Sequence, residues 1–197
     1  NKILFYLLFG FYCIKNILCD EDQQIIIPKS QVSCNFNNDN CDWYTNNYID
    51  ENGISTRYWT RRNYGTPSTS TGPNNGHYCP IDNPTYGRFC VKSDTTSNYY
   101  VYTEASGYFN KKFDLILRNP IVANTSNCGL IFWTSMYGSR MGSLLLQIKY
   151  NNTNTWKTIW SKSGNSGTRN WIQNAIFFDN STNYFNMRFR GITGSSF

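Results

Sequence analysis

The sequence is poor in the residues that most hydrolytic enzymes use. Its 197 residues include one histidine, His77, and glutamate occurs only at positions 21, 51 and 104. Neither a G-x-S-x-G nor an H-E-x-x-H motif is present, so the common signatures of serine hydrolases and zinc peptidases are absent from the sequence. A histidine-dependent catalytic site would have to use His77, which turn-forming residues surround. These scarcities favour a non-catalytic protein.

Long apolar runs are also scarce. The longest, Ile3–Ile14, has 12 residues, whereas a helix needs about 20 residues to cross a bilayer. Lys2 precedes this run and Lys15 ends it. The pattern predicts a secretion signal peptide over residues 1–19, with cleavage after Cys19. A buried strand or a short membrane anchor is the alternative.

No segment of ten residues repeats its apolar positions with the helical period of 3.6 residues. Charged residues make up 15% of the chain and aromatic residues 17%, a balance that suits a β-rich core. Apolar residues alternate with polar ones over 113–118, 143–150 and 185–191, as in half-buried strands. In the last of these segments, Arg188 and Arg190 are expected to face water. Many short strands joined by turns predict an all-β, antiparallel sandwich.

Seven cysteines are present, and two of them, Cys13 and Cys19, would leave with the signal peptide. The other five are an odd number for a secreted domain. The short separations along the sequence favour disulfide bridges between Cys34 and Cys41 and between Cys79 and Cys90. Cys128 then has a partner beyond Phe197, forms an intermolecular bridge, or stays a buried free thiol. The spacings contain no C-x-x-C pair, so we expect no metal cluster.

Basic residues predominate late in the chain, where residues 140–197 hold seven of them against one acid, Asp179. Such an excess could attract acidic glycans, anionic lipid or an acidic protein, although solvated strand faces are the simpler interpretation. We expect no nucleic-acid partner for a secreted chain. Glycosylation sequons begin at Asn124, Asn151 and Asn180, each between predicted strands.

A set of short motifs occurs in a specific order along residues 34–197. They are Cys34-x-Phe36, Cys41-x-Trp43, Tyr58-Trp59, Gly72-Pro73 with His77, Tyr100–Ser106, Cys128–Phe132, Met136–Gly138, Met141–Leu144, Trp160, Trp171 and Phe189–Gly191. Each motif alone is weak, but their joint order and spacing resemble the MAM domain, an extracellular adhesion and interaction module. The resemblance implies a jelly-roll-like sandwich that acts in cell–cell or protein–protein contact.

The resemblance also sets expectations for domains and cofactors. A segment over 20–33 would lead from the signal peptide into a MAM-like domain over 34–197, whose closing segment and last cysteine are missing. Asn37 and Gly76 stand where calcium-holding members of the family carry acidic residues. Because carboxylates are the main calcium ligands, these departures weaken any calcium site, and we expect no cofactor.

The resulting functional hypothesis is a non-catalytic module that is secreted or lies on the extracellular side of the plasma membrane. Its partner would be an extracellular protein or a second copy of the chain. Tyr58, Trp59, Arg61 and Arg62 form an aromatic and basic cluster of the kind enriched at contact surfaces, although Trp59 could simply be a core residue. The alternatives are a carbohydrate-binding jelly roll and an accessory domain of a larger secreted or membrane-anchored enzyme.

Overall fold

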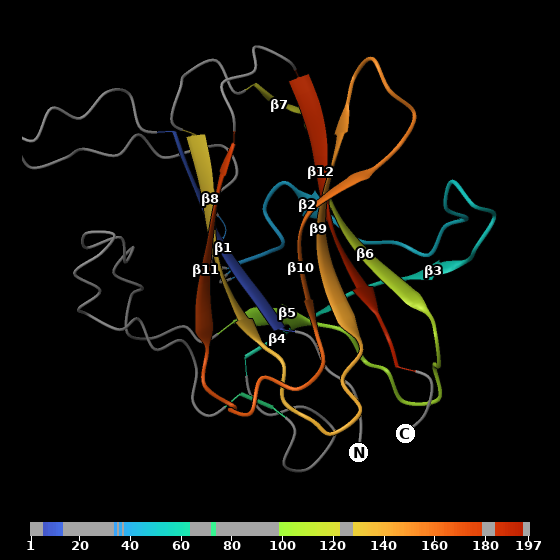
Figure 1. Cartoon of the computed structure of the whole chain (residues 1–197), viewed down its shortest axis with the longest axis vertical. Helices are drawn as coiled ribbons and strands as arrows, with labels where there is room; N and C mark the ends of the chain where they lie inside the picture. Colours follow the sequence, from blue (N-terminus) through green and yellow to red (C-terminus); the bar gives the residue numbers. More distant parts are fainter. Residues whose placement is uncertain are drawn as a thin grey trace, which may run out of the picture.

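A computed structural model shows two β-sheets that face each other (Figure 1). The structure describes residues 6–13, 34, 36, 38–63, 72–73, 99–122, 128–178 and 184–194. For residues 6–13, 122 and 128 it describes only the backbone. The described residues form strands, turns and loops but no helix, so they include no helix that could span a membrane. The predicted all-β sandwich is confirmed.

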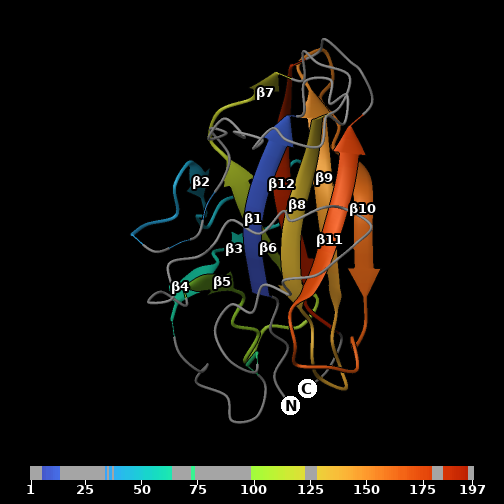
Figure 2. The same ribbon diagram turned by 90° about the vertical axis from the view of Figure 1, so that its left-hand side faces the viewer.

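The first sheet has five strands. In spatial order they are β11 (Ile172–Phe178), β8 (Cys128–Ser135), β1 (Tyr6–Cys13), β5 (Tyr100–Tyr102) and β4 (Thr60–Arg62). All neighbouring pairs are antiparallel. Figure 2 shows this sheet facing the viewer, with β1 beside β8. The first sheet is thus assembled from segments spread over the whole chain.

The second sheet has seven strands. Its main order is β10 (Lys157–Ser163), β9 (Ser143–Tyr150), β12 (Tyr184–Ile192), β6 (Lys112–Leu117) and β2 (Trp43–Tyr44). Strand β7 (Ile121–Val122) pairs with β12, and β3 (Thr56–Arg57) pairs with β6. The β3–β6 pair is parallel, whereas the other pairs are antiparallel. Because β2 and β3 both pair with β6, the chain between them loops out from this strand.

An aromatic core fills the space between the sheets. Phe132 on β8 lies 5.0 Å, between ring centroids, from both Phe189 on β12 and Trp160 on β10. Phe132 and Phe189 are fully buried. The alternation predicted for β9 is confirmed, because Leu144, Leu146 and Ile148 are all buried. Rings from both sheets therefore hold the sandwich together mainly through apolar burial and edge-to-face contacts.

One expectation about β12 is wrong. Arg188 and Arg190 were expected to face water, yet they are 1% and 4% exposed. They do point away from the core between the sheets, as the alternation requires. A loop from elsewhere in the chain covers them, which the local pattern of β12 could not indicate.

The segment expected to be a signal peptide also takes part in the fold. Tyr6–Cys13 forms β1 and pairs with β8 along its whole length. This position corresponds to the alternative of a buried strand. Removal of residues 1–19 as a leader remains a prediction, as do the boundaries of the segments 1–19, 20–33 and 34–197.

A disulfide between Cys34 and Cys41 confirms the first predicted bridge, with a Cα–Cα distance of 5.9 Å. It closes the loop that precedes β2, where Trp43 is buried. The second predicted bridge, Cys79–Cys90, lies outside the described residues.

Candidate interaction surface

A hairpin over Tyr48–Thr56, called here the 48–56 hairpin, projects from the second sheet. A bridge between Ile49 and Ser55 closes it, and the Thr56 N–H donates to the Tyr48 carbonyl at 2.7 Å. Gly53 adopts a φ of +73°, a conformation that glycine supplies without strain. Ile49 is 65% exposed and Ile54 is 40% exposed. In Figure 1, the chain leading into β3 extends beyond the sheet on the right. The hairpin thus exposes two apolar side chains, one on each side of its turn.

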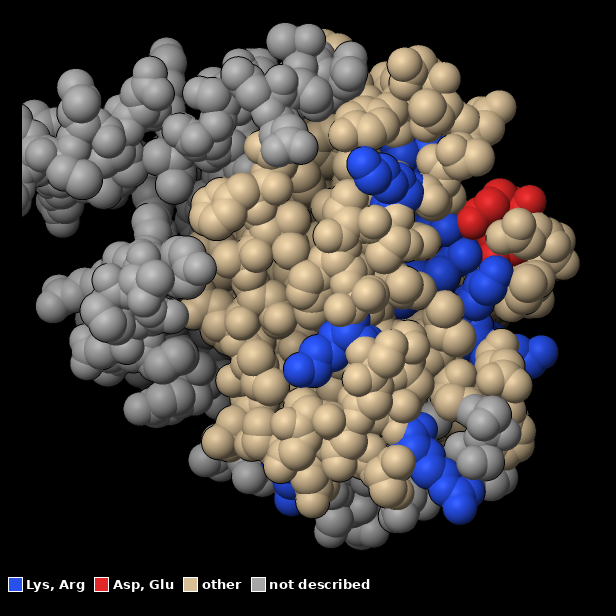
Figure 3. Space-filling view, viewed as in Figure 1, with Lys and Arg blue, Asp and Glu red and all other residues tan. Residues whose placement is uncertain are grey.

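Beneath the 48–56 hairpin lies an ion network that is buried except at Glu51, which is partly exposed. It contains three cations and three anions: Lys112, Arg188, Arg190, Asp50, Glu51 and Asp114. Asp50 and Glu51 come from the hairpin, whereas the other four side chains come from β6 and β12. Figure 3 shows acidic atoms beside basic ones at this edge of the molecule. The charges balance, so the network ties the hairpin to the sheet without leaving an unpaired buried charge.

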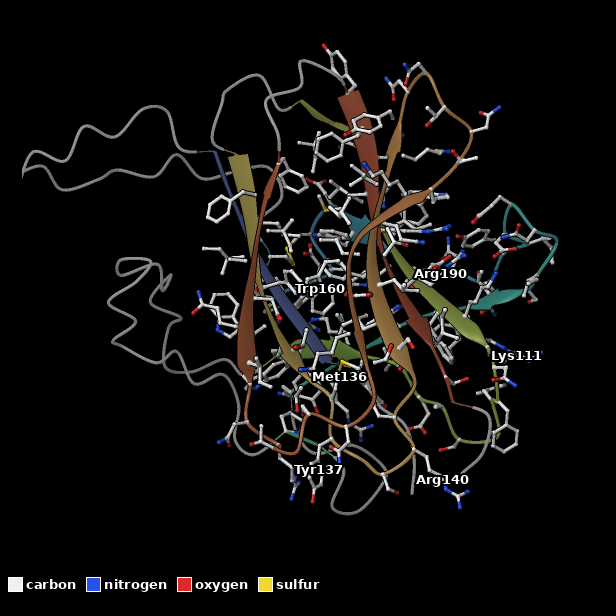
Figure 4. The ribbon with its side chains drawn as sticks, viewed as in Figure 1. Lys111, Met136, Tyr137, Arg140, Trp160 and Arg190 are labelled. Atoms are coloured by element: carbon white, nitrogen blue, oxygen red, sulfur yellow. A yellow bond between two sulfur atoms is a disulfide. The ribbon has the colours of Figure 1, made fainter. Side chains whose placement is uncertain are left out.

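Arg190 and Asp114 form the centre of the network. The Arg190 Nε and Nη2 atoms donate to the two Asp114 carboxylate oxygens at 2.7 and 2.6 Å, a bidentate pair. Tyr48 donates its hydroxyl to the same carboxylate. Figure 4 shows Arg190 on the hairpin side of the second sheet, whereas Trp160 lies between the sheets. Burial, followed by the nearby Asp114 carboxylate, raises the pKa of Tyr48, so its hydroxyl stays protonated and able to donate.

Arg188 connects the network to the β9–β10 turn. Its guanidinium donates to Glu51 at 2.7 Å and to Gln147 at 2.8 Å. The same guanidinium lies 4.1 Å from the centre of the Trp156 ring, which the Lys149 ammonium also approaches. This arrangement accounts for the burial of a full positive charge on the outer face of β12.

The carboxylates of the hairpin are held ionised. Burial of Asp50 opposes its charge, but hydrogen bonds from Lys112, Ile54 and Asn52 outweigh that effect and lower its pKa from 3.8 to about 2. For Glu51, the hydrogen bonds from Arg188 are the largest cause, and its pKa falls from 4.5 to about 2. Neither group can serve as a general acid near neutral pH.

These shifts predict acid sensitivity. A carboxylate whose pKa is lower in the folded than in the unfolded chain stabilises the fold at pH values above its unfolded-state pKa. That contribution is lost as the pH falls through the folded-state pKa. We expect the free energy of unfolding to decrease as the pH is lowered from 4.5, the ordinary pKa of a glutamate, to about 2, the pKa of both groups in the folded protein. Asp50 alone accounts for about 2 kcal/mol of this change. Urea unfolding followed by tryptophan fluorescence at a series of pH values measures it. In Asp50→Asn the dependence should flatten, and a wild-type curve as flat as that of the variant would contradict the assignment.

The contact cluster predicted from the sequence is divided in the structure. Tyr58 is 53% exposed, as a contact residue requires, whereas Trp59 is buried and its indole donates to the Phe113 carbonyl at 3.0 Å. Trp59 is therefore a core residue and not part of the surface. Arg61 lies over the Tyr99 ring at 3.7 Å, and Arg62 donates to the Tyr102 hydroxyl at 3.3 Å. Both arginines are half-buried and occupied by contacts within the domain.

Most of the other predicted site residues cannot be compared with the structure. Asn151 is exposed in the turn between β9 and β10, a position that suits a glycosylated asparagine. Asn124, Asn180, Asn37, Gly76 and His77 lie outside the described residues, as do Cys79 and Cys90. For Cys128 only the backbone is described. Within the described ranges, no group of three or more His, Cys, Asp or Glu side chains is arranged to hold a metal ion.

Sequence reasoning missed the ion network. Its members come from the segments 48–56, 112–114 and 188–190, and no motif links them. One signal was available in two neighbouring strands. Arg188 and Arg190 alternate with core residues on β12, and Asp114 lies between the core residues Phe113 and Leu115 on β6. Opposite charges at matching positions of two strands indicate a cross-strand pair.

Comparisons of the sequence with known proteins identify its family. The family model of the MAM domain, meprin/A5/mu, matches residues 34–197. Similar proteins include MAM domain-containing glycosylphosphatidylinositol anchor protein 1 of Mus musculus, 28% identical over 98% of this chain and 18% of the relative, and its namesake in Gallus gallus, 30% identical over 71% of this chain and 14% of the relative. The chain thus spans less than a fifth of the length of these relatives. Since the family model matches most of the chain, the chain belongs to the MAM domain family.

Proposed function

We propose that this MAM domain is a non-catalytic protein–protein contact module on the extracellular side of the cell. Family membership supports an adhesion-type role, and the names of its relatives indicate attachment to a membrane anchor in those proteins. The partner is an extracellular protein or a second copy of the chain. Acidic glycans remain a further candidate ligand for the basic residues late in the sequence.

The observation that carries this proposal is the rigid presentation of apolar side chains. The ion network fixes the 48–56 hairpin, so Ile49 and Ile54 are exposed without the hairpin being loose. Tyr58 follows the hairpin and is also exposed. A preorganised apolar surface loses little conformational entropy on binding, which is what a contact site needs.

The disposition of the acidic groups supports a non-catalytic role. Asp50, Glu51 and Asp114 are engaged by arginine and lysine side chains, and the lowered pKa values of Asp50 and Glu51 keep these two ionised. A general acid or base needs a pKa near the working pH and access to a substrate. These carboxylates are suited to holding the hairpin.

A cell-aggregation assay tests the proposal. Cells that display the chain on a membrane anchor are mixed with unmodified cells, and clusters are counted by flow cytometry. We expect displaying cells to cluster with each other or with the unmodified cells. The double substitution Ile49→Asp and Ile54→Asp should weaken clustering by about 30-fold, the effect of losing a contact worth about 2 kcal/mol.

The matched control is Tyr184→Asp, which alters an exposed aromatic residue outside the 48–56 hairpin. It should cluster like the wild type. Equal clustering by the double variant and the wild type would exclude the hairpin as the contact surface. An absence of clustering by the wild type with either kind of cell would remove the support for an adhesive role.

A further inference from the structure

Strands β10 and β11 run along the same side of the sandwich, as Figure 2 shows, and each lies at the edge of its sheet. Among the described strands, β10 pairs only with β9, and β11 pairs only with β8. An edge strand presents a row of backbone N–H and C=O groups that can pair with another chain. This side of the domain therefore has two positions at which an extended segment can add to a sheet.

Strand β10 has features that oppose such an addition. Its pairing with β9 is irregular at one point, as at a β-bulge. Lys162 lies opposite Leu144, which is fully buried, so both side chains point to the core side of the sheet. Lys157 lies opposite the buried Ile148 and points to the same side. Bulges and inward-pointing charges are two devices by which natural edge strands avoid pairing with other chains.

Strand β11 lacks these features. Its seven residues pair with β8 at consecutive positions without a shift, and they include no charged residue, proline or glycine. Their side chains are half-buried, apart from Phe177, which is exposed. A regular, uncharged edge of this kind is the type to which extended segments add. Of the two edges on this side, β11 is therefore the one suited to accept a strand.

The inward-pointing residues of β10 determine which side chains such a strand should carry. Lys162, Trp160 and Lys157 lie opposite alternate residues of β9 and so form one row. The Trp160 ring packs against a ring of β8, between the sheets. Neither lysine forms an ion pair with a residue that the structure describes. Figure 3 views this side, where basic atoms lie among uncharged ones and acidic atoms appear at the hairpin edge. The row favours an acidic, an apolar and an acidic side chain at alternate positions.

We propose that the side of β11 away from β8 binds an extended segment of a protein partner, which adds to the first sheet as a further strand. The segment carries acidic residues at positions i and i+4, which meet Lys162 and Lys157, and a large apolar residue at i+2, which packs beside Trp160. Backbone pairing supplies affinity, and the side-chain pattern supplies specificity. A second copy of the chain fits less well, because pairing of two β11 strands brings the β10 lysines of both copies together.

This site adds a second surface to the proposed contact function and names the chemistry of its partner. It rests on that function only in that the ligand is a protein segment. The site shares no residue with the 48–56 hairpin. The cell-aggregation assay of the hairpin variants and a peptide titration of β11 can therefore fail independently of each other.

Peptide binding to the purified full chain tests the proposal by isothermal titration calorimetry. The probe is the capped peptide Thr-Asp-Val-Phe-Val-Asp-Thr, and its control carries lysine in place of both aspartates. We expect saturable binding of the probe, about 10-fold tighter than that of the control, because two exposed ion pairs replace two repulsive contacts. In the double variant Lys157→Glu and Lys162→Glu, the preference should reverse. No saturable binding of the probe, or the same preference in both proteins, would overturn the proposal.

Methylation of the probe's backbone distinguishes strand addition from simple charge attraction. Alternate residues of an extended peptide direct their N–H groups to the same side. Methylating one alternating set should therefore abolish binding, whereas methylating the other set should leave most of the affinity. Equal binding by the two methylated peptides would contradict strand addition. Sedimentation of the full chain supplies a further check, since a dimer that the probe dissociates would assign the β11 edge to a second copy and overturn the proposed partner.

Discussion

Replacing Arg190 with methionine should lower the free energy of unfolding by about 3–5 kcal/mol, the usual cost of removing one partner of a buried ion pair. The Arg190 guanidinium forms a bidentate pair with the Asp114 carboxylate, which is fully buried. Methionine fills much of the same space but leaves that carboxylate with less compensation. Urea unfolding at neutral pH, followed by tryptophan fluorescence, measures the loss.

A control and a double variant separate charge from packing. Lys157→Met removes an exposed cation of β10 and should change stability by less than about 0.5 kcal/mol. Combining Arg190→Met with Asp114→Leu should recover part of the loss, because the second change removes the uncompensated charge. If Arg190→Met alone were as stable as the wild type, the network would not be the element that holds the hairpin.

Replacing Phe132 with alanine should destabilise the fold by about 3–5 kcal/mol, the range for deleting a large core side chain. Phe132 is fully buried and contacts rings from two strands of the opposite sheet, Trp160 and Phe189. Its loss leaves a cavity between the two layers. Thermal and urea unfolding measure the effect.

Two matched substitutions calibrate this result. Phe132→Leu keeps most of the buried volume and should cost about 1–1.5 kcal/mol. Phe177→Ala removes a ring that is 62% exposed and should cost much less than Phe132→Ala. If Phe132→Ala and Phe177→Ala lowered the stability by equally small amounts, the two sheets would not pack around Phe132 as described.

The ion network links stability to the proposed function. The same contacts that bury Arg188 and Arg190 also fix Asp50 and Glu51, which lie between the exposed Ile49 and Ile54. Weakening the network should therefore loosen the hairpin before the sandwich itself unfolds, because local opening costs less than global unfolding. For this reason the double aspartate variant of the hairpin tests contact more directly than any change in the network.

The sequence by itself determined the sandwich and its inner face. Alternation in 143–150 identified Leu144, Leu146 and Ile148 as core residues, and the spacing of Cys34 and Cys41 predicted their bridge. Such features are local, since a period of two residues or a short loop reports the structure of its own segment. The family resemblance rested on the order of similarly local motifs.

Only the tertiary structure decided what covers each outer face. The pattern of β12 correctly turned Arg188 and Arg190 away from the core, but a hairpin more than 130 positions earlier in the sequence buries them. The apolar run at the amino terminus is likewise compatible with a leader or with a strand, and its pairing with β8 is a long-range contact. Periodicity fixes the direction of a side chain relative to its own strand. Which distant segment meets that side chain depends on the assembly of the whole sheet.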